Sequence, residues 1–225
     1  MSQEQPATIP DTVWKLVQTY GQSIEVEAGQ LLWQSGDFRT EHFYLVTRGL
    51  LRLFHDTSSA KVVTLLAIGP GGILGHHHNP KIKTHVTGAE AVTYSKLLAF
   101  PSDKLAHLLQ QTDDLGRAFT FWFRDQLFLQ LAESNTRLEL EHDSAKVKVA
   151  HILLALDRQG YLDRIDRQHI ADLANLTVET TVRTLSQLLR EGILKTSHFT
   201  TLQETERLAL ADLLEPYEAT ELPYS

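Results

Sequence analysis

The sequence contains no cysteine. Disulfide bonds, cysteine-ligated zinc and cysteine-ligated iron–sulfur clusters are therefore excluded. It also has no apolar run close to the roughly 20 residues that cross a bilayer. Its first residues, MSQEQP, lack the basic and apolar parts of a secretion signal. Together these absences predict a cytoplasmic protein.

Sequence signatures of common enzyme classes are missing as well. The chain has no P-loop and no Gly-x-Gly-x-x-Gly motif. His142, Asp143 and Ser144 supply the three residue types of a hydrolytic triad, but contiguous residues cannot adopt triad geometry. We therefore expect a protein that is not an enzyme.

Positive charge is also in short supply. The 225 residues include 21 Lys and Arg against 28 Asp and Glu, which gives a formal net charge of −7 at pH 7. The length suits two modest domains, and the apolar fraction of 42% suits a folded chain. Binding to nucleic acid would then depend on locally placed cations. The cations expected to face phosphate are Arg167, Arg183, Arg190 and Lys195, with His169 and His198.

Residues 166–194 predict a helix, a tight turn and a second helix. In the first helix, Ile170, Leu173 and Ala174 form an apolar stripe. The turn falls at Asn175-Leu176, and Thr177 is a favourable N-cap residue for the second helix.

The second helix is expected to be amphipathic. Its predicted buried residues are Val182, Leu185, Leu188 and Leu189. Its opposite face carries Glu179, Thr180, Arg183 and Gln187. Side chains of these types form hydrogen bonds with base edges in the DNA major groove. The pattern therefore predicts a DNA-recognition helix, and an ordinary helical hairpin is the alternative.

The N-terminal half, from Ser23 to about Phe100, predicts short strands separated by glycine-bearing turns. The β-rich runs are Val26, 31–33, 43–46, 50–54 and 62–66, and the turns contain Gly29, Gly36, Gly49 and residues 69–72. Strands at this even spacing indicate a jelly-roll-like barrel.

A long helix is predicted from about Asp114 to His142. Its heptad-spaced residues are Phe121, Arg124, Phe128, Leu131, Asn135 and Leu138. Such a repeat is typical of a coiled coil, in which Asn135 could set the register. A second apolar face with Phe119, Phe123 and Leu127 could pack on the barrel, so both kinds of packing remain open.

The run from Leu176 to Arg183 (LTVETTVR) resembles the helix-turn-helix of the Crp/Fnr family of bacterial transcription regulators. It is closer to the Fnr branch because a valine precedes Glu179. Residues 32–37 (LWQSGD) and 43–53 (FYLVTRGLLRL) closely resemble the cyclic-nucleotide-binding fold of the same family. The resemblance covers roughly residues 23–202.

The resemblance implies an α+β fold in three parts. The expected parts are an N-terminal jelly-roll β-barrel effector domain (1–112), a dimerisation helix with its hinge (113–143) and a C-terminal winged helix-turn-helix domain (144–225). The wing is expected at residues 193–196 and 200–202, followed by a closing helix at 204–214. The implied partners are a second copy of the chain, a palindromic double-stranded DNA site and RNA polymerase.

The resemblance also assigns roles within the second helix. Carried over, Glu179 would accept a hydrogen bond from a cytosine amino group and Arg183 would donate to guanine O6 and N7. The Fnr branch usually has serine where this chain has Val182, which could contact only a thymine methyl or face the core. The expected DNA-binding residues are Arg167, Gln168, Thr177, Val178, Glu179, Thr180, Val182, Arg183, Gln187 and Lys195.

The expected effector pocket departs from the family. A cAMP site of this fold has Gly-Glu, which binds the ribose, and then Arg followed by Ser or Thr, which binds the phosphate. Here Gly75-His76 and Lys83-Thr84 occupy these positions, and lysine lacks the bidentate fork of arginine. We therefore expect no cAMP binding and, without cysteine, no iron–sulfur cluster. The expected pocket residues are Gly75, His76, His77, Lys83 and Thr84.

A run of histidines, His76-His77-His78 with His85 nearby, could bind a transition metal. In the haem-dependent CO sensors of this family, a histidine ligand occupies the position of His77. Those sensors also use a nearby cysteine, which is missing here. Adjacent residues of an extended loop point in alternating directions, which favours a solvated loop over a shared ion. We therefore expect no resident metal.

The sequence as a whole predicts a homodimeric regulator that binds DNA without cAMP and without needing an effector. One alternative is a haem- or metal-dependent sensor that uses the loop from His76 to His78. The other is an interaction module that does not bind DNA.

Overall fold

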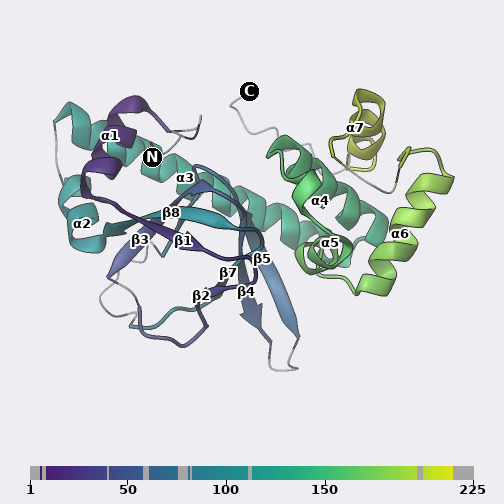
Figure 1. Cartoon of the computed structure of the whole chain (residues 1–225), viewed down its shortest axis with the longest axis horizontal. Helices are drawn as coiled ribbons and strands as arrows, with labels where there is room; N and C mark the ends of the chain where they lie inside the picture. Colours follow the sequence, from purple (N-terminus) through teal and green to yellow (C-terminus); the bar gives the residue numbers. More distant parts are fainter. Residues whose placement is uncertain are drawn as a thin grey trace. The chain divides into compact units, whose positions relative to one another are not determined.

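The computed structural model describes residues 6, 9–39, 41–57, 61–75, 81, 83–110, 113–196 and 200–214. The chain divides into two compact units, Met1–Ala132 and Glu133–Ser225 (Figure 1). Their boundary falls inside the long helix, whereas the three-part division by sequence places boundaries after residues 112 and 143. None of the helices described is long and apolar enough to cross a membrane.

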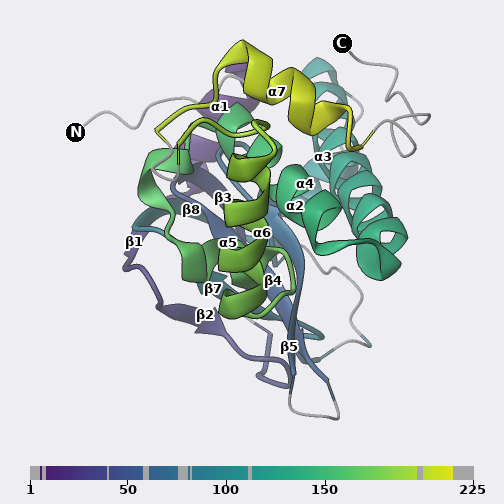
Figure 2. The same ribbon diagram turned by 90° about the vertical axis from the view of Figure 1, so that its right-hand side faces the viewer.

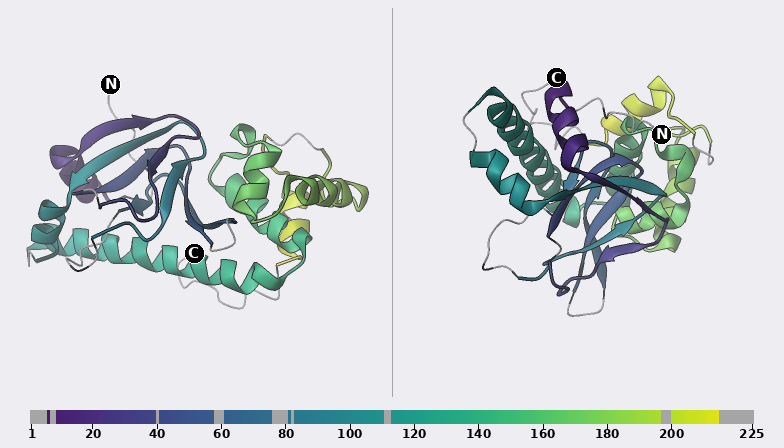
Figure 3. Two further views of the ribbon diagram at one scale, coloured as in Figure 1. Left: turned by 90° about the horizontal axis from the view of Figure 1, so that it is seen from below. Right: turned by 60° about the vertical axis from the view of Figure 1, so that its left-hand side comes forward.

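The first unit contains two four-stranded antiparallel sheets (Figure 3). The strand order is β1-β8-β3-β6 in one sheet and β2-β7-β4-β5 in the other. The strands are β1 (Gln22–Val26), β2 (Leu31–Trp33), β3 (His42–Arg48), β4 (Leu51–Asp56), β5 (Val62–Ile68), β6 (Ile73–Leu74), β7 (Gly88–Ala91) and β8 (Ser95–Pro101). This arrangement confirms the jelly-roll-like barrel of an α+β fold.

The two sheets enclose an apolar core. Val26, Val46 and Leu97 from the first sheet pack with Trp33 and Leu51 from the second. Strand β8 is buried on both faces, so its apolar residues form a continuous run without the alternation that marks a half-exposed strand. This explains why the sequence pattern does not single out β8.

Three helices cover the outer face of the first sheet (Figure 3). They are α1 (Asp11–Tyr20), α2 (Ser102–Gln110) and the N-terminal part of α3 (Asp114–Glu139). The core on this side contains Trp14 and Val17 of α1, and Phe119 and Phe123 of α3. Phe119 and Phe123 therefore pack on the barrel. They belong to the second apolar face that was expected on the long helix. Neither α1 nor α2 was predicted from the sequence.

The turn between β3 and β4 requires glycine. Gly49 has a φ of 94°, a conformation that L residues rarely adopt. A Cβ at this position would also lie 2.5 Å from the Cα of Ser95. The predicted turn at Gly49 is thereby confirmed, with both a conformational and a steric reason.

The second unit is helical (Figure 2). After α3 the chain forms η1 (Leu140–His142), α4 (Ala145–Arg158), η2 (Leu162–Arg164), α5 (Arg167–Leu173), α6 (Val178–Arg190) and α7 (Glu204–Ala211). Helix α4 is central: Val149, Leu153 and Leu156 are buried, and α4 packs against α5, α6 and α7. The long helix predicted to reach His142 ends at Glu139 and continues as η1.

The segment after α6 differs from the predicted wing. Neither 193–196 nor 200–202, the described parts of the expected hairpin, forms a strand. The backbone N–H of Lys195 instead donates to the Glu206 carboxylate at 2.8 Å. A side-chain acceptor here takes a donor that a sheet ladder would need. Helix α7 then begins at Glu204, the predicted start of the closing helix.

Candidate nucleic-acid interface

Asp166 begins the helix-turn-helix. Its side chain accepts a hydrogen bond from the backbone N–H of His169 at 2.9 Å, and the Asp166 N–H donates to His169 Nδ1 at 3.4 Å. The bond from the His169 backbone lowers the pKa of the Asp166 carboxyl, against the opposing effect of burial. This reciprocal cap places the expected DNA-binding residues Arg167 and Gln168 in the first turn of α5, where both are exposed.

The turn between α5 and α6 depends on Asn175. Its φ of 57° is left-handed, and no other non-glycine residue of the described chain has a positive φ. Asn175 N–H donates to the Asp172 carbonyl at 3.4 Å, and Leu176 N–H donates to the Ala171 carbonyl at 2.9 Å. These are the two bonds of a Schellman motif, in which asparagine tolerates the left-handed position. The predicted turn at Asn175-Leu176 is confirmed.

Thr177 is the N-cap residue of α6, as predicted. Its Oγ1 accepts from the Thr180 backbone N–H at 3.1 Å, and the two hydroxyls are 2.9 Å apart. This cap satisfies one of the backbone donors that a helix leaves free at its start. Helix α6 therefore begins at Val178, whose side chain is exposed.

The buried face of α6 is rotated relative to the sequence prediction. Its buried residues are Thr181, Thr184, Leu185 and Leu188, whereas Val182 and Leu189 are only half-buried. The prediction was therefore wrong for Val182 and Leu189. The Thr184 hydroxyl donates to the Thr180 carbonyl at 2.8 Å, so Thr184 occupies its core position without an unmet donor.

Glu179 and Arg183 lie one helical turn apart on the opposite, exposed face of α6. Neither side chain forms a hydrogen bond or an ion pair with any residue that the structure describes. Glutamate and arginine at this spacing often pair with each other. Here the carboxylate acceptors and the guanidinium donors both remain available to a ligand.

Three of the other expected DNA-binding side chains already form hydrogen bonds within the protein. Gln187 donates to Glu191 at 2.8 Å, and Gln168 donates to Asp172 at 2.9 Å. The Lys195 ammonium donates to the side chains of Gln203 at 2.6 Å and Thr205 at 3.0 Å. Contacts of these three side chains with DNA would exchange bonds already formed within the protein.

The heptad-spaced residues of α3 form a continuous exposed face. The exposed fractions are 53% for Phe121, 49% for Phe128, 58% for Leu131 and 69% for Leu138. Arg124 and Asn135, at the remaining heptad positions, are exposed as well. Leu127 instead packs against the barrel core. The helix thus carries two apolar faces, of which one is covered within the chain.

The expected effector pocket is described only in part, because residues 76–80, with the candidate ligands His76, His77 and His78, lie outside the described chain. Gly75 lies beside Tyr44 and Trp33. Lys83 is exposed, and Thr84 forms an isolated β-bridge with Phe38. His85 is buried and stacks on Trp33 at a centroid distance of 4.2 Å. The described residues contain no group of three potential metal ligands.

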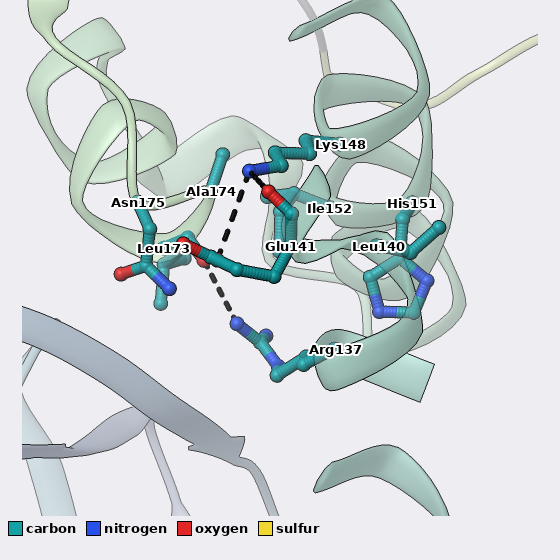
Figure 4. A pocket seen from close by; sticks show the side chains of 9 residues that line it. All are labelled: Arg137, Leu140, Glu141, Lys148, His151, Ile152, Leu173, Ala174 and Asn175. Atoms are coloured by element: carbon teal, nitrogen blue, oxygen red, sulfur yellow. Dashed lines mark hydrogen bonds and ion pairs between the residues drawn. The ribbon is translucent and has the colours of Figure 1, made fainter. Parts of the chain in front are cut away.

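A charged cluster at the end of α3 was not predicted from the sequence. The Glu133 carboxylate accepts from Arg137 Nε at 2.7 Å and lies 3.1 Å from His151 Nε2. Arg137 Nη1 also donates to the Leu173 carbonyl at 2.8 Å. These contacts connect the last turns of α3 to His151 of α4 and to Leu173 of α5 (Figure 4). In the sequence, the i, i+4 spacing of Glu133 and Arg137 is its one visible sign.

Each of the two units contains a segment that matches a known domain family. Residues 23–112 match the family described as "Cyclic nucleotide-binding domain", and residues 147–211 match the "Crp-like helix-turn-helix domain". The cyclic AMP receptor protein of Thermus thermophilus is 31% identical over 171 residues, which cover 74% of this chain and 76% of that protein. The nitrogen fixation regulation protein FixK of Bradyrhizobium diazoefficiens is 26% identical over 191 residues, which cover 79% and 76%.

Solved structures show the same fold. FixK2 from Bradyrhizobium japonicum has a TM-score of 0.70 at 22% identity and covers 86% of this chain and 96% of its own. A CooA mutant from Carboxydothermus hydrogenoformans has a TM-score of 0.68 at 16% identity and covers 93% and 97%. The matches to both domain families and the 31% identity to the cyclic AMP receptor protein show that the chain belongs to the Crp/Fnr family of transcription regulators, which have a DNA-binding helix-turn-helix.

Proposed function

We propose that two copies of the chain bind a palindromic DNA site, each placing α6 in the major groove of one half-site. The observation that carries this proposal is the pair of free, exposed side chains Glu179 and Arg183 on the face of α6 opposite its buried residues. A dimer of helix-turn-helix domains contacts half-sites about one helical turn apart.

Each side chain of the exposed face has an expected role. Arg183 donates to guanine O6 and N7, and Glu179 accepts from a cytosine amino group. Val182 is half-buried and contacts at most a thymine methyl group. The start of α6 carries Thr177, Val178 and Thr180. We expect these residues to lie close to the DNA backbone or to the bases. Arg167 and Lys195 contact phosphates, which carry much of the affinity, and Gln187 faces base edges. Gln168 belongs to the same DNA-contacting surface.

The homodimer is supported by the exposed heptad face of α3. Phe121, Phe128 and Leu131 are large apolar side chains, each about half exposed within the single chain. Burial of such a stripe against a second copy removes apolar surface from water. Asn135 lies at a heptad position in the same stripe, where an asparagine pair sets register.

We propose further that DNA binding requires no cAMP. One relative is named a cyclic AMP receptor protein, but the phosphate-binding arginine of a cAMP site is replaced here by Lys83, which is exposed. A lysine is a point charge without bidentate geometry. Another relative is named a probable transcriptional activator. Activation by contact with RNA polymerase is one expected outcome for this chain, and repression by occlusion of the promoter is the alternative.

The test is selection of binding sites from random duplex DNA by the purified full chain, with no ligand added. Enrichment of a palindrome with a guanine in each half-site supports the proposal. Enrichment only after addition of cAMP contradicts effector independence but keeps DNA binding. A requirement for hemin or a divalent metal supports the sensor alternative. No enrichment under any of these conditions supports an interaction module and overturns the proposal.

A further inference from the structure

The exposed apolar face of α3 contains one strongly charged position. Arg124 lies between Phe121 and Phe128 in the heptad series, and Asp125 follows it. The side chains of Arg124 and Asp125 are 65% and 60% exposed. An arginine in the seam of a coiled coil is costly, because its charge loses water on burial unless a partner of opposite charge is present. The burial of apolar surface therefore does not explain Arg124.

The spacing of the series assigns Arg124 to a definite heptad position. Coiled coils alternate steps of three and four residues between the a and d positions. The step from Phe121 to Arg124 is three residues and the step from Arg124 to Phe128 is four. Arg124 is therefore a d residue, and Asp125 is an e residue. In two parallel strands in register, a d residue packs into a hole that includes the d and e residues of the other strand.

Within one chain, Arg124 and Asp125 use only part of their hydrogen-bonding capacity. Arg124 Nε and Nη2 both donate to Asp125 Oδ1, at 3.2 Å and 3.0 Å. Neither Arg124 Nη1 nor Asp125 Oδ2 has a hydrogen-bond partner among the residues that the structure describes. Each copy of the chain therefore presents an unused charged donor and an unused charged acceptor at neighbouring positions.

Two-fold symmetry makes this pair self-complementary. In a two-fold interface, each contact between a residue of one copy and a different residue of the other occurs twice. Arg124 Nη1 of each copy would donate to Asp125 Oδ2 of the other. The guanidinium and carboxylate charges of the layer then cancel. The Phe121 ring, whose centroid lies 5.2 Å from the guanidinium carbon of Arg124, adds a favourable cation–π contact.

On the basis of the homodimer proposed above, we propose that Arg124 and Asp125 form an ionic layer between two copies of the chain and select the second copy as the partner. The layer keeps the two α3 helices parallel and in register, because a shift or a reversal of one helix separates Arg124 from Asp125 of the other copy. It also disfavours a chain that carries the wrong charge at either position. The apolar heptad residues supply the burial, and the ionic layer supplies the choice of partner.

Charge reversal tests the layer in the full-length protein without DNA. Arg124→Glu leaves only carboxylates in the layer, and Asp125→Lys leaves only cations. Because like charges across an interface repel, we expect each variant alone to raise the dimer dissociation constant by about a hundredfold or more in sedimentation equilibrium. An equimolar mixture of the two variants should form a heterodimer, because each strand then carries the charge that the other lacks. Native mass spectrometry distinguishes the heterodimer from both homodimers by mass.

A second arginine–aspartate pair in the chain provides the matched control. Arg164 follows Asp163, its Nε lies 3.8 Å from the Asp163 carboxylate, and its guanidinium carbon lies 5.6 Å from the centroid of the Tyr161 ring. The two side chains are 46% and 49% exposed and belong to η2, outside the heptad series. Arg164→Glu and Asp163→Lys should change the dimer dissociation constant by about twofold or less.

Wild-type dissociation constants for Arg124→Glu or Asp125→Lys would overturn the ionic layer and leave the homodimer standing. The layer is also overturned if the mixture of these two variants stays monomeric, or if the control variants weaken the dimer equally. Formation of the heterodimer supports the layer and shows that both variants are folded. A wild-type chain that is monomeric at every concentration contradicts the homodimer itself, and the layer with it.

Discussion

The carboxylate of Glu206 accepts a hydrogen bond from the backbone N–H of Lys195. Glu206 Oε1 accepts from the Lys195 N–H at 2.8 Å, and Oε2 accepts from the Gln203 N–H at 2.8 Å. The residue is 3% exposed. One buried side chain thus starts α7 and fixes the segment that follows α6.

Replacement of Glu206 by alanine should leave both N–H groups without this acceptor. We expect Glu206→Ala to lower the free energy of unfolding of the second unit by about 1–3 kcal/mol. Glu204→Ala, in the exposed first turn of the same helix, should change it by about 0.5 kcal/mol or less. The three tryptophans, Trp14, Trp33 and Trp122, all lie in the first unit. Unfolding should therefore be followed by circular dichroism, and equal effects of the two variants would contradict this prediction.

Arg183 should carry sequence specificity. We expect Arg183→Ala to weaken binding to the selected DNA site by roughly 1–3 kcal/mol while binding to scrambled DNA changes much less. Arg158→Ala, an exposed arginine at the end of α4, is the matched control. Fluorescence anisotropy with both DNAs, at one fixed salt concentration, measures the difference. Wild-type affinity of Arg183→Ala for the selected site would contradict the assigned role.

Leu131 should be part of the dimer contact. A charge at this position would be buried against the second copy, so Leu131→Glu should shift the protein from dimer to monomer in sedimentation velocity experiments. Leu208→Glu is a close control, because Leu131 and Leu208 are both 58% exposed and Leu208 lies on α7. A dimer that survives Leu131→Glu, or dissociates equally with Leu208→Glu, would argue against a dimer through α3.

Glu133 should make stability depend on pH. Burial by itself raises the pKa of this carboxyl, but the hydrogen bond from His151 and the charge of Arg137 outweigh burial and lower the pKa to about 2. A carboxyl with a lowered pKa contributes stability above its unfolded value of 4.5, and this contribution is lost as the pH falls towards 2.

The matched comparison is wild type against Glu133→Gln. Wild type should be more stable by about 2 kcal/mol or less at pH 5 and above, since the 31% exposure of the side chain weakens its interactions. The difference should shrink as the pH falls from about 5 towards 2. Urea unfolding at several pH values measures it, and a difference that does not vary with pH would contradict the assignment.

Much of the helix-turn-helix could be predicted from the sequence because its determinants are local. Asp166 caps α5 and Thr177 caps α6 through backbone groups three residues away. Asn175 permits the left-handed turn by its own conformational preference. The exposure of Glu179 and Arg183 follows from helical periodicity, because the opposite face must pack on α4 and α5.

Other features could not be predicted because their partners are distant in the sequence. Strand β8 pairs with β1 and β3, and burial on both faces removes the alternation that reveals a strand. The placement of Thr184 in the core depends on a hydrogen bond to the Thr180 carbonyl, which a division into polar and apolar residues does not represent.

The amino-acid pattern alone was enough for the family resemblance, for the order of the barrel and the helix-turn-helix, and for the exposure of Glu179 and Arg183 on α6, because caps and periodicity act over a few residues. Which surfaces are covered depended on the packing of the helices and sheets. The packing of α4 against α3 brings His151 next to the Glu133–Arg137 pair. The backbone of Lys195 binds the Glu206 carboxylate at a position where a wing strand was expected. The contacts with His151 and Glu206 join residues that approach each other only in the folded chain. Their formation depends on desolvation and on available acceptors, which a linear pattern does not contain.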